Sequence, residues 1–135
     1  MAAFNLCANF TLFPDDTPLP PNFTLAAFDF DQLGGPQWFV NITGAERGLQ
    51  FPPQGMEITI PVPVRTVRFR IGTFAGPVDI AALDTLGTTV KTKTIPALNS
   101  YVNTGIRAPE ISSVVLTNGG NEGILVRICV AISTP

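Results

Sequence analysis

Histidine is absent from the 135-residue sequence. Ser-His-Asp and Cys-His nucleophilic systems need an imidazole base, and the usual four-ligand zinc sites draw on imidazole or on several thiolates. The chain has only two cysteines, Cys7 and Cys129, which are too few to hold zinc alone. These absences exclude the familiar histidine-dependent hydrolases and the usual zinc sites, and we expect no enzyme.

Charge is scarce as well. Charged residues make up 13% of the chain, against roughly 25% in typical soluble domains. Such a surface favours association, as in a secreted module, an oligomer or an assembled fibre. Residues 1–60 hold six acids against Arg47 alone, whereas residues 61–135 hold seven bases against four acids. This asymmetry indicates either scattered surface charge or complementary faces for head-to-tail contacts between copies.

Long apolar runs are missing too. No stretch approaches the roughly 18 residues of a membrane helix, so no membrane span is expected. The first residues, Met-Ala-Ala-Phe-Asn-Leu-Cys, lack the basic start, the apolar run and the cleavage site of a signal peptide.

Apolar residues alternate with polar or small ones along the chain and do not recur at helical spacing. Thirteen prolines and twelve glycines separate short runs rich in Val, Ile, Thr and Phe. In the clearest run Val67, Phe69 and Ile71 point one way, while Arg68 and Arg70 point the other. We predict strands over 4–12, 24–30, 38–42, 49–51, 56–60, 67–71, 78–82, 88–95, 113–117 and 124–132, with a weak strand near 101.

Without crossover helices these strands must pair antiparallel. The sequence therefore predicts one all-β domain over residues 1–135, an antiparallel two-sheet jelly-roll-type sandwich of about nine strands. Turns are expected at Asp84-Thr85-Leu86-Gly87 and at Asn118-Gly119-Gly120-Asn121. Pro61 and Pro63 should place their strand at an edge or interrupt it with a bulge.

The first and last strands of a jelly roll are commonly neighbours, which brings Cys7 and Cys129 together. Three outcomes stay open: an internal disulfide, two free thiols, or pairing between subunits. An internal bond would close nearly the whole chain into one loop.

Carboxylates offer two weak alternatives. Asp29 with Asp31, or Asp84 with Glu122, would suit a two-carboxylate glycosidase, although Asp29 and Asp31 alternate with Phe28 and Phe30 as on a solvated strand face. Asp84 and Glu122 also lie at turns, where a structural calcium ion would find oxygen ligands and where Asp commonly caps amides. No other cofactor is expected.

Two amphipathic aromatics mark the candidate ligand site. Trp38 is in phase with Val40 and Ile42, which favours the core over an exposed platform. Tyr101 lies between Asn99 and Asn103 in a polar segment. Since ligand sites commonly combine aromatic rings with polar groups, we take Tyr101, Asn99, Asn103 and Trp38 as candidate ligand-binding residues.

Basic residues could form a patch across neighbouring strands. Its members would be Arg65, Arg68, Arg70, Lys91 and Lys93. Such a patch would attract sulphated glycans or acidic partners, but a solvated sheet face is the simpler interpretation. Without interleaved aromatics it does not indicate nucleic acid.

Two segments resemble a known type of domain. These are "EITIPVPVRTVRFRIGTFAGPVDIAALDTLGTTV" from Glu57 and "ISSVVLTNGGNEGILVRICV" ending at Val130. Their Val-rich strand, their Pro-Val strand ending in Ala-x-Asp-x-x-Gly and their late strand-turn-strand resemble the galactose-binding-like or carbohydrate-binding-module-like jelly rolls of secreted bacterial proteins. The resemblance implies a non-catalytic binding role and a structural calcium ion.

Together these features give two functional hypotheses. The first is a non-catalytic binding module for glycans or another surface ligand, located outside the cell or at its surface. The second is a self-assembling subunit of a fibre, shell or surface layer, indicated by low charge, by the sign difference between the halves and by an apolar first strand able to pair with a neighbour. We also expect a homo-oligomer.

Overall fold

The computed structural model describes residues 2–43 and 45–134. The predicted all-β class is confirmed, with ten strands and a single 3-10 turn, η1, among these residues. The elements are β1 (Ala2–Asn9), η1 (Phe10–Leu12), β2 (Asn22–Leu25), β3 (Phe28–Gln32), β4 (Phe39–Thr43), β5 (Glu46–Phe51), β6 (Met56–Thr73), β7 (Val78–Leu83), β8 (Thr89–Ile95), β9 (Tyr101–Asn118) and β10 (Gly123–Thr134).

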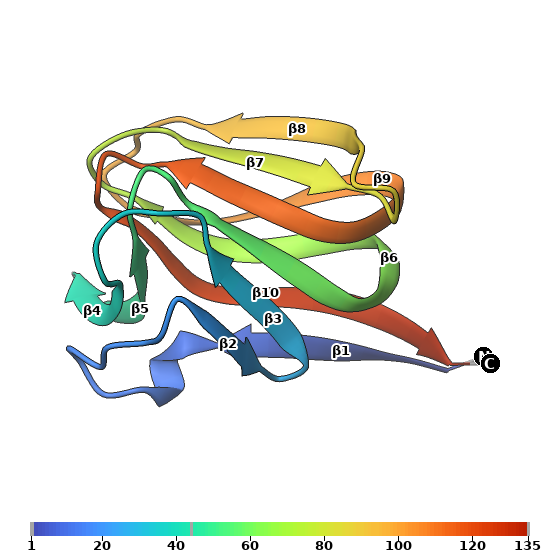
Figure 1. Ribbon diagram of the computed structural model, residues 1–135, viewed down its shortest axis with the longest axis horizontal. Coiled ribbons are helices and arrows are strands. Elements are labelled where there is room, and N and C mark those ends of the chain that lie inside the picture. The colour runs from blue at the N-terminus through green and yellow to red at the C-terminus, as the bar shows by residue number, and fades with distance from the viewer. Residues whose placement is uncertain (1, 44, 135) are drawn as a thin grey trace.

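The strands form an antiparallel sandwich whose two sheets share their longest strands (Figure 1). The first sheet runs β2-β3-β6-β9-β7-β8 and uses residues 56–59 of β6 with 113–116 of β9. The second sheet uses residues 66–73 of β6, paired with 101–107 of β9 on one side and with β10 on the other. Both β1 and β5 pair with β10, and β4 pairs with β5.

The crossing between sheets occurs at a proline-containing bend. The pairing of β6 with β9 loses its register between Thr59 and Val64, the segment that holds Pro61 and Pro63. Proline cannot donate to a ladder, so two of them in four residues break the pairing and allow the strand to bend. The predicted bulge is therefore present, but the segments on either side belong to one continuous strand.

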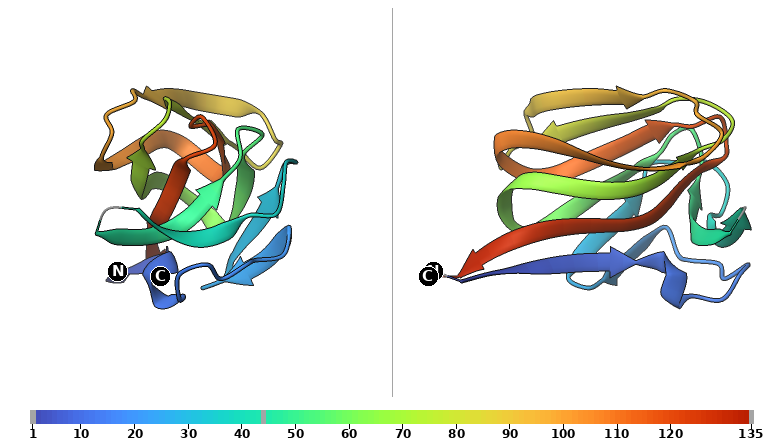
Figure 2. Two further views of the ribbon diagram at one scale, coloured as in Figure 1. Left: turned by 90° about the vertical axis from the view of Figure 1, so that its left-hand side faces the viewer. Right: turned by 180° about the vertical axis from the view of Figure 1, so that it is seen from behind.

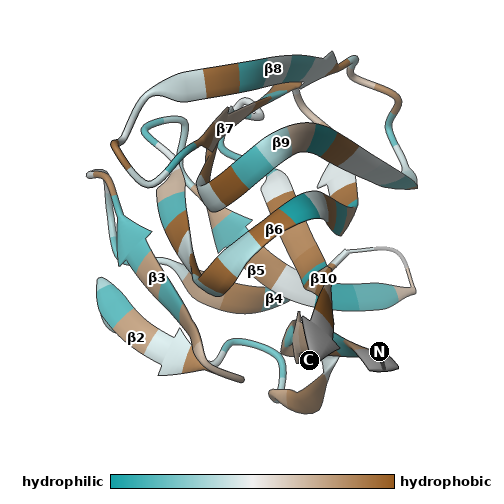
Figure 3. Ribbon diagram, turned by 90° about the vertical axis from the view of Figure 1, so that its right-hand side faces the viewer, coloured by the Kyte–Doolittle hydropathy of each residue, from teal (hydrophilic) through white to brown (hydrophobic). Residues whose placement is uncertain are grey.

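The core lies between the sheets and follows the alternation of the sequence. Along β6, Val67, Phe69 and Ile71 are buried, whereas Arg68 is exposed. Figure 3 shows the same alternation of hydrophobic and hydrophilic residues along β6 and β9. Each sheet thus has one apolar inner face and one polar outer face, as expected for antiparallel sheets.

The segment over 24–30 is a correction to the predicted strands. It forms the ends of β2 and β3, joined by Ala26 and Ala27 with φ of 52° and 69°. Residues 10–12, assigned to the first strand from sequence, instead form η1, because the Asn9 side chain accepts a hydrogen bond from the Thr11 amide at 3.0 Å. Both departures are local turns that alternation alone cannot detect.

The predicted pairing of the first and last strands is present. β1 and β10 run antiparallel from Ala2↔Thr134 to Asn9↔Arg127 (Figure 2). Cys7 lies directly opposite Cys129, and the two form a disulfide across 122 positions of sequence. The structure thus adopts the first of the three outcomes left open by the sequence.

Both predicted turns connect consecutive strands, and those of the first turn, β7 and β8, also pair with each other. The turn at 84–87 joins β7 to β8, and the turn at 118–121 joins β9 to β10. All four residues of the second turn, Asn118, Gly119, Gly120 and Asn121, have positive φ. The described residues contain no helix of the length and apolarity that crossing a membrane would need.

Candidate functional site: a groove on the outer face of the second sheet

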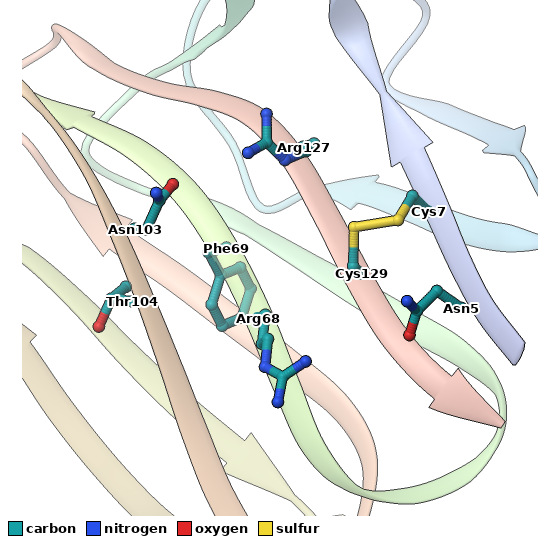
Figure 4. Close-up of a pocket in the computed structure, with 8 residues that line it drawn as sticks. All are labelled: Asn5, Cys7, Arg68, Phe69, Asn103, Thr104, Arg127 and Cys129. Carbon is teal, nitrogen blue, oxygen red and sulfur yellow. A yellow bond between two sulfur atoms is a disulfide. The ribbon is translucent and has the colours of Figure 1, made fainter. Parts of the chain in front are cut away.

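A groove of about 330 Å³ lies on the outer face of the second sheet. Four strands build it, because β1, β10, β6 and β9 lie side by side there and each turns its polar positions outward. It is lined by Asn5, Cys7, Arg68, Phe69, Asn103, Thr104, Arg127 and Cys129 (Figure 4). The volume is at the small end of the range for ligand pockets.

The disulfide forms one wall of the groove. Cys7 and Cys129 occupy a directly opposed pair of β1 and β10, out of phase with the buried Ala8, Ile128 and Val130. The bond therefore lies on the outer face instead of in the core. It holds the β1 side of the groove, which carries Asn5, at a fixed spacing from the β6 side.

Two guanidinium groups lie at opposite ends of the groove. In Figure 4, Arg127 and Arg68 lie at the two ends, with the disulfide and Asn5 along one side and Asn103 and Thr104 along the other. Among the described residues, neither Arg68 nor Arg127 takes part in a hydrogen bond or an ion pair of its side chain. Both charges are therefore available to a ligand.

The neighbouring Arg70, by contrast, is paired. Its Nε donates to Glu46 Oε1 at 2.6 Å and its Nη2 to Glu46 Oε2 at 2.5 Å, while its Nη1 donates to Asn103 Oδ1 at 3.0 Å. This bidentate pairing lowers the pKa of the Glu46 carboxyl, with a smaller contribution from the charge of Arg127. The same pair raises the pKa of Arg70.

Tyr101 lies on the same outer face, two residues before Asn103 on β9, but it does not line the groove. Its hydroxyl donates to the carbonyl oxygens of Thr43 and Glu46, at 2.8 and 3.1 Å. The ring is half-buried, edge-on to Phe74, with the Arg70 guanidinium 5.7 Å from its centroid. Burial of the ring, followed by the nearby Glu46 carboxylate, raises the pKa of the phenol.

Of the other three predicted ligand-binding residues, one lines the groove and two lie elsewhere. Asn103 lines the groove, whereas Asn99 is exposed in the turn before β9 with φ of 51°. Trp38 is 1% exposed and its Nε1 donates to the Pro20 carbonyl at 2.7 Å. The ring packs in the core beside Phe23, as the alternation with Val40 and Ile42 favours, and therefore offers no exposed platform.

The candidate metal ligands do not meet. β7 pairs Val78 with Asn118 and Leu83 with Ser113, so Asp84 and Glu122 lie at opposite ends of this strand pair. Asp84 accepts hydrogen bonds from the Leu86 and Thr88 amides, which makes it a turn cap. No cluster of three or more potential metal-ligating side chains occurs among the residues that the structure describes.

The first carboxylate pair considered for glycoside hydrolysis lies on a solvated strand face. Asp29 and Asp31 lie on the exposed side of β3, where they accept hydrogen bonds from Thr24 and Asn22 of β2. Each carboxylate thus serves a cross-strand contact between polar neighbours. This is the solvated strand face that the alternation with Phe28 and Phe30 indicates.

The five basic residues considered for a cross-strand patch do not lie on neighbouring strands. Lys91 and Lys93 lie on β8, which pairs with β7 in the first sheet and is no neighbour of β6. Lys93 instead donates to the Gly105 carbonyl at 3.2 Å. Arg107 and Arg127 are the residues that share the outer face with Arg68 and Arg70. Only knowledge of the strand order could have included them in the patch.

The two outer faces consequently differ in charge. The first sheet carries Asp29, Asp31, Glu57 and Asp79 on its outer positions, all of which accept hydrogen bonds from uncharged side chains. The second carries the four arginines together with Glu46. The named acids and arginines thus lie mainly on opposite faces, although Asp79 and Glu46 do not follow the division between the two halves of the sequence.

Comparison with known proteins identifies the fold. No protein-family model matches the sequence, and neither does any curated protein. A variant of a family 29 carbohydrate-binding module superposes with a TM-score of 0.60 at 11% identity, over 97% of this chain and 87% of that one. Another variant, complexed with mannohexaose, gives 0.59 at 8% identity, over 97% and 93%. A family 29 module from Piromyces equi gives 0.55 at 6% identity, over 98% and 93%.

The fold is thus that of the carbohydrate-binding-module-like β-sandwiches. The similarity extends along nearly the whole chain and concerns the fold, since identity is low throughout. It confirms the resemblance inferred from the strand patterns at 57–90 and 111–130. The function must be argued from the groove itself.

Proposed function

We propose that this chain is a non-catalytic module that binds a glycan in the groove between Asn5 and Asn103. The observation that carries the proposal is the set of polar side chains converging on one groove. Asn5 is exposed, and Asn103 keeps its amide NH₂ free of protein acceptors among the described residues because only its Oδ1 is used, by Arg70. Amides and guanidiniums are suitable partners for sugar hydroxyls.

The fold and the chemistry of the chain support this proposal. Structures with this fold are named carbohydrate-binding modules, one of them in complex with mannohexaose. The chain has no histidine, and three of the four carboxylates considered for hydrolysis, Asp29, Asp31 and Asp84, are used in cross-strand contacts or turn capping. An extracellular setting fits the disulfide, because such bonds persist in oxidising compartments.

Affinity electrophoresis and a glycan array test the proposal. We expect retention of the wild-type protein on at least one polysaccharide, and a loss of retention when Asn5→Ala and Asn103→Ala are combined. The control is Thr59→Ala, an exposed position on the outer face of the first sheet. Absence of binding to every glycan, or equal losses in the control, would contradict the proposed function.

Self-assembly is the second candidate, and one observation favours it. An acidic outer face and a basic one on opposite sheets could stack head to tail between copies, which would form an open filament unless the rotation closes. Light scattering at several protein concentrations should then show a mass that increases with concentration and decreases with added salt. A constant monomer mass excludes this candidate.

A further inference from the structure

We propose that the groove takes an anionic glycan, whose carboxylate or sulphate groups are bound by Arg68 and Arg127. The inference rests on the proposed function and adds the ligand class. Its first support is that the two guanidiniums line the same groove and have no partner of their own among the described residues.

The strand register places Arg68 and Arg127 close enough to bind the same ligand. Arg68 lies opposite Cys129 and Arg127 lies two residues before Cys129, so the two are diagonal neighbours on adjacent strands. Diagonal neighbours of this kind are about 7–8 Å apart, within reach of long side chains. Figure 4 shows the two guanidiniums directed to different ends of the groove, with the disulfide along one side. A chain lying along the groove could therefore present one acidic group to each.

The arginines of the face differ in what they already bind. Each guanidinium nitrogen of Arg70 already donates to Glu46 or Asn103. Glu46 neutralises one arginine, which leaves the outer face with a net positive charge from Arg68, Arg107 and Arg127. The opposite outer face is acidic, so the field of the molecule directs an anion towards the groove and away from the other sheet.

Aromatic stacking is not offered by the groove, and this excludes the usual means of holding an uncharged sugar. Phe69 contributes to the lining but is only 2% exposed, and it is in phase with the core. Tyr101 is outside the lining and its hydroxyl is used. Charge-assisted hydrogen bonds from arginine forks, which match carboxylate and sulphate geometry, must supply the affinity.

The amides complete the site. Asn5 on β1 and Asn103 on β9 lie on opposite sides of the two arginines (Figure 4). Their NH₂ groups can donate to sugar hydroxyls or ring oxygens, while the arginines bind the acidic substituents. The groove thus combines two fixed cationic positions with two neutral polar ones, as a polysaccharide with regularly spaced acidic groups requires.

The test measures binding of the intact protein to four polymers by isothermal titration calorimetry. Polygalacturonate supplies carboxylates, dextran sulphate supplies sulphates, mannan is uncharged, and duplex DNA is a polyanion without sugar acids. We expect binding to polygalacturonate or dextran sulphate that weakens as salt is added. Combining Arg68→Gln with Arg127→Gln should weaken it at least about tenfold.

The control removes a positive charge elsewhere. Lys91→Gln changes an exposed residue of β8 that does not line the groove and should alter the affinity by less than about twofold. Circular dichroism and thermal unfolding establish that both variants are folded. Arg68→Lys should recover part of the affinity, since it restores the charge without the fork.

Each of the other outcomes contradicts the anionic ligand, the site or the proposed function. Binding to mannan alone, unchanged by the arginine variants, would overturn the anionic ligand and leave the proposed function in place. Equal losses in the lysine control, or equally tight binding of DNA, would show a general charge effect and overturn the site. No binding to any of the glycans, here and on the array, would overturn both.

Discussion

At the scale of single residues, the groove face depends on which charges are already paired. Glu46 and Arg70 are each about a quarter exposed, 27% and 23% for their side chains, so their bidentate pair is screened by solvent and should stabilise the fold by at most about 1 kcal/mol. The pair matters more for the position of the Arg70 side chain than for the stability of the fold. It fixes Arg70 on one side and leaves Arg68 and Arg127 as the groove-lining arginines whose side chains have no partner among the described residues.

The lowered pKa of Glu46 predicts a defined pH dependence. A carboxyl whose pKa is lower in the folded than in the unfolded state stabilises the fold above its ordinary value of 4.5. That stabilisation is lost as the pH falls from there through the folded pKa. The variant Glu46→Gln should be less stable than wild type by about 0.5–1 kcal/mol at neutral pH.

Chemical denaturation at a series of pH values measures this difference. The two proteins should converge as the pH falls well below 4.5, the ordinary carboxyl value. The control is Glu122→Gln, an exposed turn residue. A difference for Glu46→Gln that persists unchanged into acid would argue against an electrostatic origin.

Trp38 gives a second prediction at this scale. Its ring is buried, and its indole N–H is satisfied by the Pro20 carbonyl. Replacement with alanine should cost about 3–5 kcal/mol of unfolding free energy, because a large core cavity results. Trp38→Phe should cost less and leave glycan affinity unchanged, since Trp38 does not line the groove. Denaturation and calorimetry on the same samples separate stability from binding.

At the scale of elements, the β2–β3 hairpin shows a local conflict between sequence and conformation. Ala26 and Ala27 both adopt positive φ in a two-residue turn, a conformation that favours Asn-Gly and strains residues with a Cβ. The sequence offered no turn signal there, which is why 24–30 was predicted to be one strand.

Relief of this strain is testable. Combining Ala26→Asn with Ala27→Gly should stabilise the protein by about 1 kcal/mol and raise the midpoint of thermal unfolding by a few degrees. The matched control is Ala45→Gly, which changes an exposed alanine outside the strands. This variant should not increase the free energy of unfolding. A neutral or destabilising effect of the hairpin variant would show that the turn is not under strain.

The strands that the sequence predicted best are those with a strict alternation. β7, β8 and β10 follow from Val78-Ile80-Ala82, from the Asp84–Gly87 turn and from the Ile and Val residues of 124–130. The course of β6 through Pro61 and Pro63 could not be predicted, because alternation does not state that one strand continues into a second sheet. That continuation is a property of the pairing with β9.

The candidate site was predicted in part for the same reason. Asn103 was chosen for its polar surroundings, and it lines the groove. Asn5 and Arg127 were missed because their relation to Arg68 depends on strand order across the sheet, although Arg127 lies between the buried Val126 and Ile128. Sequence phase gives the face of a strand, and only the topology shows which strands share that face.

At the scale of the whole molecule, the disulfide joins the first strand to the last. It spans 122 positions, and a closed loop of this length could contribute about 4–5 kcal/mol in the chain-entropy model, with 2–4 kcal/mol typical of measured disulfides. Combining Cys7→Ser with Cys129→Ser should therefore lower the unfolding free energy by a few kcal/mol. Denaturation with and without reductant measures this, and the serine variant should no longer respond to reductant.

The same bond also determines how the molecule would carry a mechanical load. Tension applied at Ala2 and Thr134 would open the β1–β10 ladder pair by pair, beginning at its end. After Leu6↔Val130 the opening would meet Cys7–Cys129, and no further backbone hydrogen bond would be loaded. In a force spectrometer the oxidised protein should lengthen only by the few residues outside the bond, whereas the reduced protein should extend fully. A module attached through these two strands would thus keep the β6, β9 and β10 parts of its groove in place while the chain that bears it is pulled, and only Asn5, which lies outside the bond, would leave the groove.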